Sequence, residues 1–241
     1  MRIIKKKIHA IAENNSFFTE KTLKQNNFIL LFSLLLFVFA YSIIKSIDFN
    51  NWLFDIIISA IVLSGVTSLK FRKKKFIRLS YFGFFTLLFL WLKHFIFTLE
   101  MKFIAFNVLI FFFIYITYSM IAYVAKNDKI TSVLILNAIN SYLLIGIIGG
   151  FLFTLLQTLY QIAGKSVETI NFSYTNTPRF FDYIYYSFIT LTTVGYGEVT
   201  PAVPAARSLA ILIGISGQLY LTVLVAILVG KFLSNNNTKK D

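Results

Sequence analysis

A six-residue segment near the C-terminal end, TTVGYG (192–197), offers a row of backbone carbonyls for binding a ligand. Its two glycines allow backbone angles that other residues avoid. Residues Thr193, Val194, Gly195 and Tyr196 can each direct a carbonyl oxygen toward one axis, and the Thr193 hydroxyl adds a further oxygen. Because neutral oxygens stacked in rings can replace the water shell of an alkali cation, the segment predicts a cation-binding path.

A short helix is expected to position this segment. The pair Thr177 and Pro178 is typical of a helix start, and Asp182 in the first turn favours the positive helix end. The helix should continue to Leu191, which gives roughly 14 residues, or about 21 Å. Because that length reaches about halfway through a 30 Å hydrocarbon core, and polar Glu198 then requires a return, the sequence predicts a buried re-entrant pore loop.

The rest of the chain is expected to be an all-α membrane protein, because 57% of its 241 residues are apolar. A helix needs about 20 residues to cross a bilayer. Six apolar runs are predicted as transmembrane helices: 28–44, 52–69, 79–97, 103–125, 133–159 and 204–233. The apolar run Phe180–Leu191 is too short to span and is assigned to the pore helix. The absence of cysteine excludes disulfides and thiolate metal sites.

The net charge of +13 is distributed in a way that favours membrane topology over nucleic-acid binding. If the N-terminus is cytoplasmic, 17 of the 23 basic residues fall on the cytoplasmic side, with 4 of the 10 acidic residues. This asymmetry predicts that both termini are cytoplasmic. The spans and the re-entrant segment together divide the chain into four predicted parts: a cytoplasmic segment 1–27, a four-helix unit 28–130 without gating charges, a pore domain 131–234 and a short tail 235–241.

The stretch SFITLTTVGYGEVTP resembles the pore signature of tetrameric potassium channels, and the resemblance extends over 132–233. It implies a homotetramer in which residues 193–197, ending at Gly197, line the potassium sites. Thr192 and Tyr186 would support the filter. Glu198 departs from the family, which usually has aspartate there, and we expect the Tyr186 hydroxyl to hydrogen-bond it.

The final span predicts a gate. Gly217 falls where the resemblance places the bending point of the inner helix, and close packing is an equally weighted interpretation. Gly214 lies three residues earlier and is expected to pack. Leu221 and Val225 continue the same face and would close an apolar constriction.

We therefore expect a potassium channel of a plasma membrane or bacterial inner membrane, with no cofactor besides potassium ions and no enzymatic activity. The fourth span contains no Arg or Lys, although voltage-gated relatives carry arginines there, so the channel should not be strongly voltage-gated. A non-selective cation channel and a non-conducting scaffold or regulatory subunit are the alternatives.

Two further groups of charged residues receive an interpretation. A basic loop is a possible binding site for anionic lipid, or simply anchors the topology. Its residues are Lys70, Arg72, Lys73, Lys74 and Lys75. Near the outer end of the third span, Lys93 is interpreted as an interfacial anchor, and His94 as an anchor or a sensor of external pH.

Overall fold

The computed structural model describes residues 18–44, 52–70, 73–96, 98–127, 129–175 and 179–237. Helices and strands follow the chain in this order: α2 (Glu20–Ile44), α3 (Trp52–Thr67), α4 (Lys73–Leu92), α5 (Leu99–Lys126), α6 (Ser132–Ile162), β1 (Ile170–Phe172), α7 (Phe180–Leu191), β2 (Val199–Pro201) and α8 (Pro204–Asn237). The fold within these residues is helical apart from two three-residue strands.

Five of these helices are long and apolar enough to cross a membrane, namely α2, α4, α5, α6 and α8. The chain is therefore a multi-pass membrane protein, as predicted. The predicted second span, 52–69, forms helix α3 of 16 residues, which is about 24 Å long and shorter than the usual span. Helix α7 (Phe180–Leu191) ends at the predicted residue, but it begins two residues after the predicted first helical residue, Pro178.

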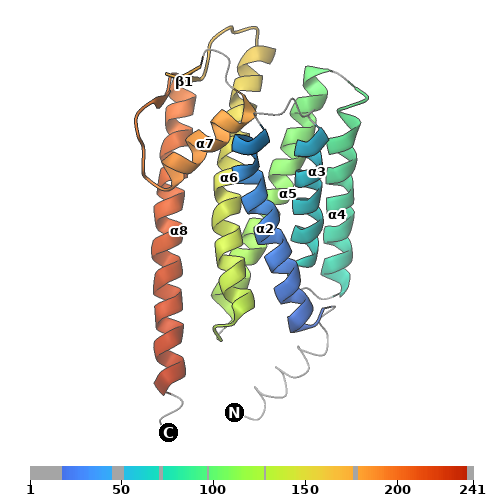
Figure 1. The fold of residues 1–241 in the computed structure, drawn as a ribbon, viewed down its shortest axis with the longest axis vertical. Coiled ribbons are helices and arrows are strands. Elements are labelled where there is room, and N and C mark those ends of the chain that lie inside the picture. The colour runs from blue at the N-terminus through green and yellow to red at the C-terminus, as the bar shows by residue number, and fades with distance from the viewer. Residues whose placement is uncertain are drawn as a thin grey trace.

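Helices α2 to α6 pack into one bundle, with α8 on its outer side and α7 lying obliquely between α8 and α6 (Figure 1). One hydrophobic core joins the first four helices to the pore part, because it contains Leu34 of α2, Ile58 of α3, Phe113 of α5, Phe151 of α6 and Ile184 of α7. Helix α5 passes into α6 through a short connection. The two helices therefore pack side by side within the same chain.

Helix α8 has few partners within the chain. Only 11% of its apolar stretch is buried, compared with 50% for α6. It contacts α6 and α7 along one side, and Tyr220 fixes it to α6 by donating a hydrogen bond from Oη to the Ala138 carbonyl at 2.7 Å. Most of the remaining apolar surface of α8 is exposed in the structure.

A small antiparallel ribbon connects the segment before α7 with the segment after it. Strand β1 pairs with β2, with Asn171 opposite Thr200. Residues 161–177, which are mostly polar, form the turret between α6 and α7, and their sequence gives no sign of a strand. The ribbon ties this turret to the backbone that leaves the TTVGYG segment.

Candidate functional site

The pore helix α7 rests on a face of α6 that is made of small residues. A Cβ atom added at Gly146 would come within 2.6 Å of the Phe188 ring, and one at Gly149 would collide with the Ser187 hydroxyl. Ser187 Oγ donates to the Gly146 carbonyl at 2.6 Å. These glycines form a packing face, which explains how α7 approaches α6 so closely.

The outer end of α7 is fixed by Asp182. Its Oδ2 atom accepts a hydrogen bond from the Arg179 backbone N–H at 2.6 Å, and its Oδ1 atom accepts one from the Tyr174 hydroxyl at 3.2 Å. Burial and the neighbouring Asp182 carboxylate raise the pKa of Tyr174, so its hydroxyl remains a donor at neutral pH. Thr177 and Pro178 lie outside the described residues, and the helix start predicted there is wrong, because Arg179 has an extended backbone and caps a helix that begins at Phe180.

The backbone of the TTVGYG segment alternates in the sign of φ. Thr193, Gly195 and Gly197 have φ values of 60°, 47° and 95°, whereas Val194 and Tyr196 are not in the positive region. Successive peptide groups in such an alternating backbone point the same way, which aligns their N–H groups on one side and their carbonyls on the other. A positive φ is unfavourable for a β-branched residue such as Thr193, so the surrounding contacts must hold it.

Hydrogen bonds fix the inner side of the segment to the end of α7. The backbone N–H groups of Thr192, Thr193 and Gly195 donate to carbonyls of α7. The acceptors are Phe188 at 2.9 Å, Thr190 at 3.1 Å and Ile189 at 3.1 Å, in that order. The Thr192 hydroxyl also donates to the Phe188 carbonyl, at 2.7 Å, and its supporting role stays a prediction. All six residues are exposed in the single chain, so one side of the segment is open.

The predicted hydrogen bond between Tyr186 and Glu198 is wrong. The neighbouring Tyr185 hydroxyl donates to Glu198 Oε1 instead, and Tyr186 is buried against Phe153, with 4.8 Å between the ring centroids. Consecutive residues of a helix point about 100° apart, so only one of the two tyrosines can face the segment. Tyr186 supports α7 through packing on α6, and Tyr185 holds the mouth of the segment.

Of the predicted gate residues, Gly217 has the most specific contact. A Cβ atom there would collide with the Leu191 carbonyl oxygen, and it would lie 2.9 Å from Leu191 Cδ1. At Gly214 the nearest atom would be the Thr190 carbonyl oxygen, at 3.7 Å, which is ordinary contact. The close-packing interpretation therefore fits Gly217 better than Gly214, and a hinge at Gly217 stays a prediction.

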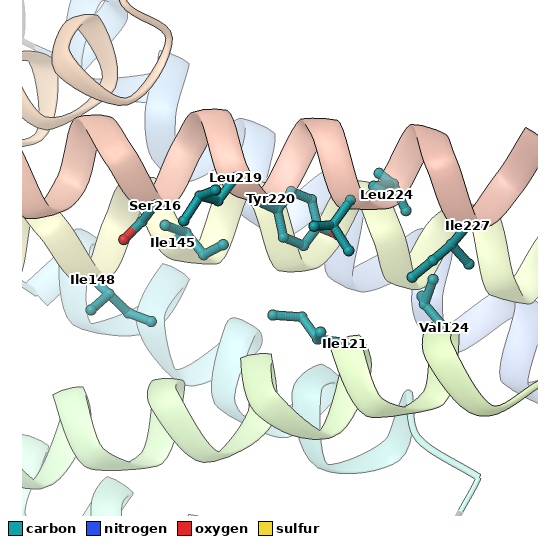
Figure 2. Close-up of a pocket in the computed structure, with 10 residues that line it drawn as sticks. Ile121, Val124, Ile145, Ile148, Ser216, Leu219, Tyr220, Leu224 and Ile227 are labelled. Carbon is teal, nitrogen blue, oxygen red and sulfur yellow. The ribbon is translucent and has the colours of Figure 1, made fainter.

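The other two predicted gate residues, Leu221 and Val225, are exposed, with 37% and 57% of their surface accessible. They lie apart from the cavity of about 470 Å³ that α8 forms with α5 and α6 (Figure 2). Leu224 and Ile227 of α8 line this cavity, opposite Ile121 of α5, and its wall is almost wholly apolar. The predicted constriction is thus on a side of α8 that its own chain leaves open.

Besides Tyr185, the sequence-based prediction left out Gln218. Its Nε2 atom donates to Thr193 Oγ1 at 3.4 Å, which links α8 to the base of the segment. The available signal was a polar residue in an otherwise apolar span.

The predictions for the charged groups outside the TTVGYG segment have different outcomes. Lys70, Lys73, Lys74 and Lys75 are exposed, and Arg72 lies outside the described residues, so the lipid interpretation stays a prediction. Lys93 is not an interfacial anchor.

Lys93 forms an ion pair with Asp55. Its Nζ atom lies 2.6 Å from Asp55 Oδ1, and the Lys93 side chain is only 13% exposed. His94 Nε2 lies 2.5 Å from the other oxygen of the same carboxylate. The physical reason is that Asp55 is completely buried on α3 and needs charged partners.

Comparison with known proteins identifies the C-terminal part of the chain. Residues 141–234 match the model of a family described as an ion channel. The match runs from the middle of α6 through α7 and the TTVGYG segment into α8, and this family is one of channels rather than enzymes. The same comparison gives no match among curated proteins or among solved structures.

Proposed function

We propose that this chain is one subunit of a homotetrameric potassium channel, and that residues 193–197 form its selectivity filter. The observation that carries the proposal is the alternating backbone of Thr193, Gly195 and Gly197. It stands at the inner end of a helix too short to span a membrane, inside the part of the chain that matches ion channels. Aligned carbonyls on an open side are the ligands that a dehydrated potassium ion requires.

The electrostatics of the site favour a cation. Helix α7 ends at Leu191, directly before the segment, so the negative end of its dipole faces the proposed ion path. No residue from Thr192 to Gly197 carries a charge, and the ligands are therefore neutral oxygens. Neutral carbonyl oxygens can replace the water shell of a monovalent ion and still let it leave, which conduction requires.

A single chain supplies only one wall of such a path, which supports a homotetramer. The segment is open on one side, and the adjoining surface of α8 is exposed over most of its length. Four copies around one axis would cover these surfaces and would bring Leu221 and Val225 toward the centre as an apolar gate. Closed cyclic symmetry is the usual arrangement for such self-association.

The proposal includes a topology and a gating property. With exposed Lys70 and the three exposed lysines of the first turn of α4 in the cytoplasm, the ends of α2 and α8 that lie nearest the chain termini are cytoplasmic, and α7 enters from outside (Figure 1). We place the protein in a plasma membrane or bacterial inner membrane. Helix α5 has lysines only near its two ends, Lys102 and Lys126, so it offers no ladder of gating charges.

The test is current or ion flux from the purified full chain in liposomes, with a potassium gradient on one side and sodium on the other. A reversal potential that follows potassium supports the proposal, and equal permeability to sodium indicates a non-selective cation channel. Absence of flux from a protein that native mass spectrometry shows to be assembled indicates a scaffold or regulatory subunit. A stoichiometry other than four would refute the homotetramer.

A further inference from the structure

Phe180, the first residue of the pore helix α7, is enclosed by phenylalanines from four other helices. Its ring centroid lies 6.3 Å from Phe37 of α2, 5.0 Å from Phe54 of α3, 6.2 Å from Phe106 of α5 and 4.8 Å from Phe151 of α6. The contact with Phe54 is edge to face, at 76°, which is a favoured arrangement of aromatic rings. We call these four residues the Phe180 cage.

A buried ion pair lies next to two rings of the cage, those of Phe54 and Phe106. Asp55, one residue after Phe54 on α3, is completely buried and bonds to Lys93 Nζ at 2.6 Å. The same Nζ atom lies 5.6 Å from the Phe54 ring centroid and 6.0 Å from the Phe106 centroid, within the range of cation–π attraction. Because Lys93 directly follows α4, the pair also ties the outer ends of α3 and α4 together.

We propose that the first four helices position the pore helix. Asp55 and Lys93 fix the rings of Phe54 and Phe106, and the Phe180 cage then fixes the outer end of α7. These are positioning residues, because none of them lies on the proposed ion path. The inference rests on the proposed function and extends it, since it gives the four-helix unit a role that needs no gating charges.

The length of α7 makes this position important for the filter. A rigid helix of 12 residues is about 18 Å long, so a tilt of about 3° around its outer end moves its inner end by about 1 Å. Binding sites lose function when their groups are misplaced by more than about 0.5 Å. A loosened Phe180 would therefore disturb the carbonyls that follow Leu191, although the two residues lie at opposite ends of the helix.

The experiment records potassium currents from the purified full chain in bilayers, at low and at high external potassium. We expect Phe180→Leu and Lys93→Met to make currents decay about tenfold faster at low potassium, the factor that a barrier lower by about 1.4 kcal/mol makes in a rate. High external potassium should slow the decay, because ions bound in the filter stabilise its conducting form. The controls are Phe84→Leu, at a site 66% exposed on α4, and Lys102→Met, at an exposed site on α5.

A double variant distinguishes the effect of losing the ion pair from a general folding defect. Lys93→Met leaves the buried Asp55 carboxylate without its lysine, and adding Asp55→Asn removes that charge, so the double variant should recover toward the parent. The inference is overturned if both single variants decay like the parent while the parent conducts. It is also overturned if they lose current equally at both potassium concentrations together with a lower melting temperature, which indicates a folding defect. A parent that passes no potassium refutes the proposed function, and this inference falls with it.

Discussion

Replacing Gly217 by alanine tests the contact between α8 and the pore helix. A Cβ atom at this position would collide with the Leu191 carbonyl oxygen and would lie 3.0 Å from the Leu191 carbonyl carbon. These are backbone atoms, so no side-chain rotation can relieve the collision, and α8 and α7 must move apart. At Gly214 the same change meets nothing closer than 3.7 Å, which makes Gly214→Ala a matched control on the same helix.

The magnitude follows from two opposing terms. Alanine favours a helix over glycine by about 0.5 to 1 kcal/mol, whereas overpacking a close contact costs about 1 to 3 kcal/mol. For Gly217→Ala the second term exceeds the first, and four subunits multiply the net loss in the proposed tetramer. For Gly214→Ala only the favourable term applies, so this variant should be as stable as the parent or slightly more stable.

The assay combines thermal unfolding of the purified protein with the permeability ratio of potassium to sodium. We expect Gly217→Ala to lower the unfolding temperature and the permeability ratio of potassium to sodium. Leu191 is two residues before Thr193, so its displacement reaches the filter. A simple hinge predicts a different result, namely lower open probability with unchanged conductance and selectivity. If Gly217→Ala matches Gly214→Ala in stability and selectivity, the packing argument is refuted.

Three further changes test the site. Gly195→Ala should abolish selective conduction in flux assays, because a φ of 47° costs an L-residue about 1 to 2 kcal/mol per subunit. The control is Gly230→Ala, at a helical site where an added Cβ atom would meet nothing within 4 Å. Tyr185→Phe should speed the decay of current, because it removes a hydrogen bond to charged Glu198 that contributes about 1.5 to 3 kcal/mol, whereas Tyr186→Phe should leave that bond intact. Voltage should change open probability only shallowly, and an effective gating valence of several charges per subunit, measured from single-channel records, would contradict the interpretation of α5.

The sequence predicted the elements of the pore better than the contacts between them. The C-terminal end of α7 followed from an apolar run of half the usual length, and the positive φ values fall where TTVGYG contains glycine, with Thr193 as the exception. The choice between Tyr185 and Tyr186 was wrong because one residue turns a helix by about 100°, and spacing alone does not fix which face meets the filter. The pairing of Asp55 with Lys93 had no local signal, since 38 residues and a helix connection separate them.

The two ends of α7 are held by different parts of the chain, and this separation has a measurable consequence. Gly217 of α8 packs on Leu191 at the inner end, whereas the Phe180 cage holds the outer end, about 16 Å away along the helix. Effects of substitutions that are more than about 10 Å apart and share no partner usually add within about 0.5 kcal/mol. Combining Gly217→Ala with Phe180→Leu should therefore give a loss of unfolding free energy equal to the sum of the single losses. The increase in the rate of current decay should exceed the sum of the two single increases. In the double variant α7 has neither support, and the position of α7 transmits both changes to Thr193. Additive decay rates would mean that the two contacts act on the filter by separate routes, and that α7 is not the element that joins them.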